Sequence, residues 1–439
     1  MTDDRAWLQA MLDVEAALAR AEARLGLMPE EDAEAIAAAC RADRFDPAAL
    51  GRDGAASGNP VVPLVRALRL AVGEPSAGRI HLGATSQDVL DTAAMLVARE
   101  ALDIVLDDLG AAADLAAGLA SRHRSTLMPA RTLLQHAVPT TFGLKAAGWL
   151  GGLDAASDQL RRVRDTRLAV QLGGAGGTLG SMGPDGAALV ATLAGELGLA
   201  TPVMPWHTDR TRIGELAGAL GVTAGAIGKP ALDIVLLAQT EVAEVADARH
   251  GTGGSSTLPQ KRNPVAAVCA LAGARRAPGL VATLLSVMPQ EHERGAGGWH
   301  AEWRPLVDLL VAVGSATAWL REALEHLDVH PDRMRADLDL TDGLVLAERY
   351  AAVLAPLLGH DRADGLVGAA ADAARASGRS LREELADRPE VASRPGLLAL
   401  VDQASAVVLD DPAGYLGSTD AFIDGALAAH ARSSGGRPA

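Results

Sequence analysis

Apolar side chains recur at intervals of three and four residues along most of the chain, which is the period of amphipathic α-helices. Near the N-terminus Leu8, Met11 and Leu18 follow this spacing, and Gly26 marks a stop. Five later stretches keep the same period over much greater lengths with few prolines; they cover residues 88–122, 139–170, 208–250, 264–288 and 300–328. The pattern therefore predicts an all-α fold built around a central bundle of long helices.

The pattern changes toward both ends of the chain. Residues 45–80 are rich in glycine, proline and asparagine and predict loops, among them a turn at Asn59. Beyond residue 340 the helical stretches become shorter, and residues 432–439 predict a disordered tail. Within the bundle, Pro230 predicts a kink. These changes predict three helical domains, which cover residues 1–100, 101–340 and 341–439.

Composition supports helices and narrows the function. Hydrophobic residues make up 49% of the 439 residues but aromatic residues only 3%, whereas strands are enriched in aromatic side chains. The 40 basic and 55 acidic residues give a net charge of −15, which repels nucleic acids and anionic membranes, so an anionic substrate needs a local basic cleft. Cys40 and Cys269 cannot form a disulfide framework, and no signal peptide or membrane-spanning run is present, so we expect a cytoplasmic protein.

A glycine-rich segment lies between two of the predicted helices, at residues 251–264. It places the hydroxyls of Ser255 and Ser256 near Lys261 and Asn263 in the sequence. Such a composition is equally typical of a solvated linker. As a functional segment it predicts a mobile lid, whose glycines allow closure and whose polar groups then meet a developing negative charge.

The same segment resembles the signature loop of the fumarase/aspartase superfamily, Ser-Ser-x-x-Pro-x-Lys-x-Asn. The resemblance implies that deprotonated Ser255 removes a proton α to a carboxylate, with Lys261 and Asn263 completing the catalytic group. It also implies the fold of that superfamily, a bundle of long helices flanked by two smaller helical domains. A serine ionises far above neutral pH, and one charge at about 4 Å contributes only ~4 kcal/mol, or about three pKa units. Since Lys261 alone is insufficient, we expect loop closure and backbone amides to supply the rest.

Two further stretches, residues 83–88 and 131–143, resemble other motifs of the superfamily. In that superfamily the motifs meet in clefts built from three subunits of a homotetramer, so the resemblance implies a homotetramer with shared active sites. The side chains that it implies in substrate binding are Asn59, Thr85, Ser86, Arg131, Gln135 and Ser256. Without the resemblance, Thr85 and Ser86 are simply capping residues of the helix predicted to begin there.

Leu133 argues against the adenylosuccinate lyases, since these members of the superfamily carry a histidine at that place in the second motif. Residues 171–179, 205–212 and 288–294 instead resemble the lactonising cycloisomerases of the superfamily. This resemblance implies a small polycarboxylate substrate of aromatic catabolism, and no cofactor; the sequence shows no metal-ligand spacing either. The side chains expected to bind the carboxylates are Arg210, Arg212, Arg294 and, as a further candidate, His300.

Two alternatives stay open. A related lyase, such as a nitrosuccinate lyase, would use the same groups for β-elimination from a succinate-type substrate. A catalytically silent homologue, comparable to the lens crystallins, would keep only the fold. The intact Ser255, Lys261 and Asn263 argue against the silent homologue.

Overall fold

The computed structural model describes residues 2–249, 252–403 and 409–434. The chain forms two compact units, each assembled from three separate stretches. The first unit comprises Met1–Leu109, Ala155–Gly228 and Cys269–Trp319, and the second comprises Gly110–Asp154, Lys229–Val268 and Leu320–Ala439. The three consecutive domains expected from the sequence stay a prediction. Residues 435–439 of the expected tail lie outside the described residues, whereas Arg432 belongs to the last helix.

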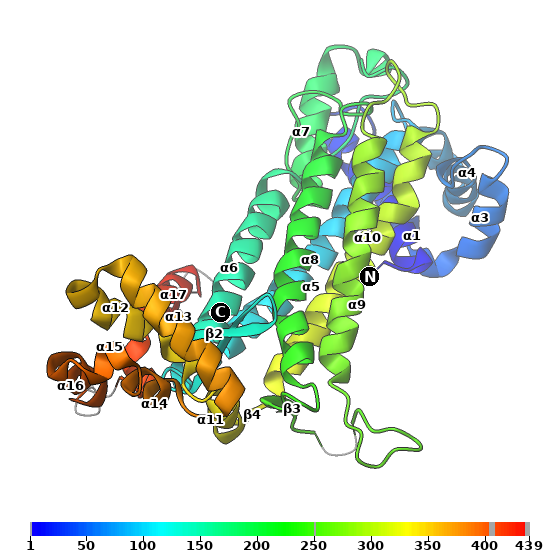
Figure 1. Ribbon diagram of the computed structural model, residues 1–439. Coiled ribbons are helices and arrows are strands. Elements are labelled where there is room, and N and C mark those ends of the chain that lie inside the picture. The colour runs from blue at the N-terminus through cyan, green and yellow to red at the C-terminus, as the bar shows by residue number, and fades with distance from the viewer. Residues whose placement is uncertain (1, 250–251, 404–408, 435–439) are drawn as a thin grey trace. The chain divides into compact units, whose positions relative to one another are not determined.

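Helices dominate the described chain, which confirms the all-α prediction. The long helices are α5 (Ser86–Arg122), α6 (Phe142–Thr166), α8 (Thr211–Leu237), α9 (Val265–Ser286) and α10 (Gly298–Glu325) (Figure 1). The helices that precede or interrupt them are α1 (Asp4–Arg24), α2 (Glu30–Ala39), α3 (Pro47–Gly54), α4 (Val61–Val72) and α7 (Gly186–Leu197). Shorter helices follow, as expected: α11 (Pro331–Asp339), α12 (Ala347–Leu358), α13 (His360–Ser377), α14 (Leu381–Ala386), α15 (Pro389–Ala392), α16 (Pro395–Gln403) and α17 (Thr419–Ser434).

Two small antiparallel sheets interrupt the helical pattern, and periodicity did not show them. Strand β1 (Leu127–Thr132) pairs with β2 (Gln135–Thr141), and β3 (Val245–Asp247) pairs with β4 (Leu327–Val329). Two predicted boundaries are therefore wrong. The helix expected from residue 139 begins only at Phe142, and the helix expected to reach residue 250 ends at Leu237, because strand pairing overrides local helical preference there. Helix α8 continues through Pro230, and a kink at that position stays a prediction.

Close helix packing in the first unit explains the abundance of alanine and glycine. A Cβ atom at Gly273 of α9 would lie 2.8 Å from the carbonyl oxygen of Ala312 and 2.9 Å from the Cβ of Ala316, both in α10. A Cβ at Gly221 of α8 would lie 3.1 Å from Val281 of α9. In this unit α8, α9 and α10 thus run side by side (Figure 1), and small residues allow their backbones to approach.

Helices α8 and α9 are also long and apolar enough to cross a membrane by length and composition alone. Core helices of globular proteins pass the same test, so this is weak evidence for a span. Half of the most apolar part of α8 is buried, compared with 28% of that of α9. Helix α9 thus leaves apolar surface exposed in the single chain.

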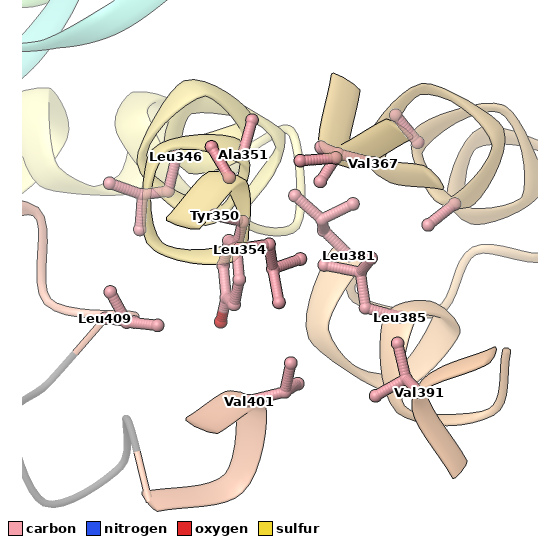
Figure 2. Close-up of a cluster of buried hydrophobic side chains, with 14 of the residues drawn as sticks. Leu346, Tyr350, Ala351, Leu354, Val367, Leu381, Leu385, Val391, Val401 and Leu409 are labelled. Carbon is pink, nitrogen blue, oxygen red and sulfur yellow. The ribbon is translucent and has the colours of Figure 1, made fainter. Parts of the chain in front are cut away.

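The second unit contains its own hydrophobic core, formed by the helices after residue 340. Figure 2 shows Tyr350, Leu354, Leu381 and Leu385 in one cluster of buried side chains, with Leu354 beside the ring of Tyr350. The hydroxyl of Tyr350 donates a hydrogen bond to the carboxylate of Asp410, so the ring is buried while its polar end is satisfied. This core forms without any contribution from the first unit.

We expect Gly143→Ala to destabilise the junction between α5 and α6. A Cβ at Gly143 would lie 2.7 Å from three backbone atoms, namely the carbonyl oxygens of Ala120 and His123 and the Cα of Arg124. Backbone cannot yield as a flexible side chain can, so we expect the free energy of unfolding to fall by roughly 1–3 kcal/mol. Urea unfolding measures this change. The control is Gly148→Ala in α6, where the added methyl group meets nothing within 4 Å; an equal loss in both variants would contradict the steric explanation.

Candidate functional site

The glycine-rich loop is closed at its base by backbone contacts. Gly254 and Arg262 form an antiparallel bridge, and both the backbone N–H and the side-chain amide of Asn263 donate to the carbonyl oxygen of Gly253, at 2.9 and 2.8 Å. A Cβ at Gly253, whose φ is +70°, would lie 2.2 Å from the carbonyl oxygen of Asn263. Only glycine fits this position. Asn263, which was expected to complete the catalytic group, thus holds the two ends of the loop together through its contacts with Gly253.

Ser255 lies inside this loop with its hydroxyl oxygen facing two backbone donors. The oxygen lies 3.3 Å from the nitrogen of Leu258 and 3.4 Å from that of Thr257, both of which donate to it. Such contacts are long for a neutral hydroxyl, but they point at the atom that would carry the charge of an alkoxide. Ser256 and Lys261 are exposed on the same loop. The structure therefore supplies the backbone amides that the sequence could only lead us to expect.

Arg131 and Gln135 belong to the hairpin of β1 and β2. Arg131 makes a bidentate ion pair with the buried carboxylate of Glu244, at 2.8 and 2.9 Å. Burial raises the pKa of Glu244, and Arg131 counteracts part of that rise. The guanidinium of Arg131 therefore neutralises an internal carboxylate, whereas the side chain of Gln135 is exposed and contacts only the carbonyl oxygen of Leu134.

The tip of this hairpin is strained and apolar. Leu133 and Leu134 have φ values of +50° and +64° and are 96% and 72% exposed. Positive φ at both residues of a two-residue hairpin loop is the geometry that asparagine and glycine prefer. A pair of leucines has no advantage there in an isolated chain.

The buried carboxylate of Asp88 organises the motif residues of the first unit. It accepts from the backbone N–H of Thr85 at 3.0 Å, from those of Gly173 and Gly174 at 2.9 Å each, and from Nε2 of His207 at 2.6 Å. Asp88 is only 1% exposed. The side chain of Asp88 thus holds three segments in one arrangement: the turn before α5, the loop of Gly173 and Gly174, and the segment of His207. Thr85 and Ser86, half-buried at the start of α5, are held by this network.

Arg210 is not available to a substrate, contrary to the expectation from the sequence. Its guanidinium is 2% exposed and lies between the carboxylates of Asp91 and Glu302. All five N–H groups are used, since they donate to these two carboxylates and to the carbonyl oxygen of Trp206. Glu302 is thus a structural partner of Arg210. Burial raises the pKa of Glu302, and the hydrogen bond from Arg210 opposes that rise.

Arg294 and Arg212 are likewise engaged within the chain. Arg294 donates to Oε1 of Gln87 and to the carbonyl oxygens of Gly174 and Ala175. Arg212 donates to the carbonyl oxygen of Arg167 at 2.9 Å. These two arginines therefore brace loops in this structure.

Asn59 and His300 lie close together. The side chain of Asn59 accepts from the backbone N–H of Val61 and donates to the carbonyl oxygen of Ser57, so it shapes its own turn. His300 is exposed, packs against the ring of Trp303, and has Nε2 at 3.7 Å from where a Cβ of Gly58 would lie. The expected site residues thus form two groups: Asn59, Thr85, Ser86 and His300 in the first unit, and Gln135, Ser255, Ser256, Lys261 and Asn263 in the second.

The motifs did not indicate Asp91 and Gln171, which belong to the buried hydrogen-bond network around Arg210. Gln171 donates to Asp91 and accepts from the backbone N–H of Trp206. One local signal was present, because Asp88 and Asp91 are acidic residues three positions apart in an otherwise apolar stretch. Elsewhere, Glu322, Glu325 and His326 come close enough together to hold a metal ion, but Arg249 already pairs with Glu322.

Comparisons with known proteins agree with this arrangement of motifs. The model of a family described as lyase matches residues 1–279. A 3-carboxy-cis,cis-muconate cycloisomerase of Pseudomonas aeruginosa is 46% identical over 97% of this chain and 93% of its own. A nitrosuccinate lyase of Streptomyces davaonensis is 44% identical over 97% of this chain and 90% of its own. The crystal structure of the 3-carboxy-cis,cis-muconate lactonizing enzyme from Pseudomonas putida superimposes with a TM-score of 0.89 at 45% identity, covering 98% and 96% of the two chains.

We expect Arg210→Leu to destabilise the first unit by about 3–5 kcal/mol, because it leaves two buried carboxylates without their counter-ion. Denaturant unfolding followed by circular dichroism measures the loss. The control is Arg304→Leu in α10, which removes an exposed arginine paired with Asp308 and costs less than about 1 kcal/mol. Equal losses for the two variants would show that the buried ion pairs have no special role.

Proposed function

The chain belongs to the lyase family of the fumarase/aspartase superfamily of enzymes, and we propose that within it the chain is a cycloisomerase that converts 3-carboxy-cis,cis-muconate to 4-carboxymuconolactone. The observation that carries the proposal is the hydroxyl of Ser255, which faces two backbone N–H groups inside the signature loop. The near full-length similarity to the cycloisomerase of Pseudomonas aeruginosa supports the choice of substrate.

In the proposed reaction one carboxylate of the substrate attacks the conjugated diene and forms the C–O bond of the lactone. A proton is added to the carbon α to another carboxylate, so no atom is lost and the product is an isomer. Read in the opposite direction, the step is a β-elimination that begins with removal of that proton. Ser255 transfers the proton, and the N–H groups of Thr257 and Leu258 stabilise its alkoxide.

The internal ion pairs restrict which groups hold the carboxylates. Arg131 and Arg210 are bound to acidic side chains, and Arg294 to loop oxygens. We therefore assign carboxylate binding mainly to neutral donors and to the ammonium group of Lys261, which is exposed on the loop. The neutral donors are Asn59, Thr85, Ser86, Gln135 and Ser256. Thr85 and Ser86 also stand at the N-terminus of α5, where the helix dipole favours an anion.

A second candidate function is nitrosuccinate lyase, which the 44% identity to the enzyme of Streptomyces davaonensis favours. The two activities differ in a simple observable. A cycloisomerase removes the absorbance of the conjugated diene from 3-carboxymuconate, whereas the lyase releases fumarate from nitrosuccinate. Purified protein offered each substrate separately distinguishes them, and activity on neither substrate would contradict both proposals.

We further propose a homotetramer in the cytoplasm, acting in the degradation of protocatechuate. The long helices expose large apolar side chains that a single chain leaves uncovered, namely Val222, Leu232, Val265, Val268, Leu285 and Val311. Large apolar side chains exposed on long helices suit an interface between protein chains. Packing of such helices between copies explains why α9 remains poorly buried in one chain.

Ser255→Ala is expected to lower kcat by a factor of about 10²–10⁴ or more, because it removes the group that transfers the proton. The free energy of unfolding should change by no more than about 0.5 kcal/mol, since the side chain is on an exposed loop. Steady-state rates with 3-carboxymuconate provide the measurement. Thr252→Ala, which removes another hydroxyl from the same loop, is the control. If Ser255→Ala retains the wild-type rate, a different group transfers the proton.

Replacing Leu133 by Asn and Leu134 by Gly tests whether the hairpin tip serves a neighbouring copy. The double variant suits the left-handed backbone better, so the isolated hairpin should become more stable. We expect the tetramer to dissociate at higher protein concentration and kcat/KM to fall, because the apolar contacts are lost. Sedimentation velocity and turnover measure these effects, with Leu70→Asn, an exposed leucine of α4, as the control. Unchanged assembly and activity would exclude the hairpin from the interface.

A further inference from the structure

The short segment that leads into α5, residues 80–85, has an unusual backbone. His81 has a φ of +66°, and Gly83 follows with a φ of +68°. Histidine seldom adopts this left-handed conformation, which persists only where surrounding contacts impose it. The segment ends at Thr85 and so determines where Thr85 and Ser86 lie at the start of α5.

A buried ion pair holds His81 in this conformation. Nδ1 of His81 lies 2.7 Å from Oε1 of Glu15 in α1. Glu15 is 1% exposed, and among the described residues its other oxygen has no hydrogen-bond partner. The contact with His81 is therefore what satisfies this buried carboxylate. From α4, Arg69 adds a hydrogen bond to the carbonyl oxygen of Ile80 at 3.1 Å.

The segment is also constrained on the side that faces Ser181 and Met182. A Cβ at Gly83 would lie 2.1 Å from the terminal methyl group of Met182 and 3.2 Å from Oγ of Ser181. Two residues later, the N–H of Thr85 donates to Asp88. The segment thus lies between α1 and residues 181–182 of the short 3₁₀ helix Gly180–Asp185, contacts both, and leads directly to Thr85.

We propose that Glu15 is a positioning residue that acts through His81 to hold Thr85 and Ser86 in place for substrate binding. The inference rests on the function proposed above, in which these two hydroxyls contact a substrate carboxylate. Glu15 itself is buried in the first unit beneath the segment and touches no candidate substrate-binding group. No local motif in the sequence links Glu15 to the site, because 66 positions separate it from His81.

The charges around His81 make this arrangement dependent on pH. Glu15 faces it from α1, Asp88 from α5, and Arg69 from α4, and Glu22 of α1 interacts with Glu15. Burial lowers the pKa of His81, but the hydrogen bond and charge of Glu15, together with Asp88, outweigh burial and Arg69, so the pKa lies above its ordinary value of 6.5. The attraction between the imidazolium of His81 and Glu15 is present below this raised pKa and is lost as the pH rises through it.

Glu22 provides a matched control on the same helix. It is as deeply buried as Glu15, but its Oε1 has no hydrogen-bond partner among the described residues and no bond joins it to His81. Burial and the charge of Glu15 raise the pKa of Glu22 to about 8, so at pH 7 its carboxyl group is mostly neutral. Glu22→Gln therefore changes the buried face of α1 with little change of charge.

The experiment compares Glu15→Gln and Glu22→Gln with the wild type in steady-state assays from pH 6 to pH 9. In Glu15→Gln we expect KM to rise roughly tenfold with kcat changed less than about threefold, because a binding contact is misplaced while the proton-transferring loop is intact. In the wild type KM should rise as His81 loses its proton. In Glu15→Gln the rise of KM should begin at lower pH, since a carboxylate at position 15 no longer raises the pKa of His81. Glu22→Gln should keep the wild-type profile at and below pH 7.

Wild-type KM and an unchanged pH profile in Glu15→Gln would overturn the proposal, as would an equal rise of KM in Glu22→Gln. If Glu15→Gln fails to fold, His81→Asn removes the same pair from its half-buried side and should raise KM in the same way; wild-type KM in that variant would also overturn the proposal. Failure of the proposed function is distinguishable, because the wild-type protein would then show no turnover of 3-carboxymuconate at any pH.

Discussion

One buried carboxylate, that of Asp88, holds together the segments that carry the candidate site in the first unit. Its two oxygens accept four hydrogen bonds, three from backbone N–H groups and one from His207. Burying a carboxylate is costly unless it is hydrogen-bonded, so these four contacts couple the surrounding loops to Asp88. The turn that bears Thr85 and the glycines at 173 and 174 are therefore parts of one rigid arrangement.

The cost of burying carboxylates also explains why several arginines are engaged inside the protein. The buried carboxylates of Asp91 and Glu302 in the first unit and of Glu244 in the second need internal counter-ions, and Arg210 and Arg131 supply them. In a chain of net charge −15, the basic groups left for a polycarboxylate are then few. This places more of the recognition on hydroxyl and amide groups, and on the loop that carries Ser255 and Lys261. The loop is suited to this role, because contacts between Gly253 and Asn263 close its base while two backbone N–H groups donate to the hydroxyl oxygen of Ser255.

Helical periodicity and the superfamily motifs were sufficient to predict the all-α fold and the long helices. They did not predict the strand pairs: β3 pairs with β4, which is distant in sequence, and β1 and β2 form a hairpin whose two-residue loop is a pair of leucines in place of the asparagine and glycine typical of such turns. For the site, motif spacing predicted roles for the signature loop, Thr85 and Ser86, and these stay predictions. It also predicted Arg210 as a ligand, because nothing in one dimension shows that Asp91 and Glu302 enclose its guanidinium. The contact between Glu15 and His81 was equally invisible, since it joins α1 to a turn whose backbone strain appears only in three dimensions.

The most direct test of the central claim is the reaction itself, run in heavy water. Purified protein is incubated with 3-carboxy-cis,cis-muconate in D₂O, and the product is examined by proton magnetic resonance. Proton transfer by a single serine held on one side of the substrate predicts 4-carboxymuconolactone with one deuterium, on one face of the carbon α to a carboxylate. Absence of lactone, or deuterium distributed equally over both faces of that carbon, would contradict the account.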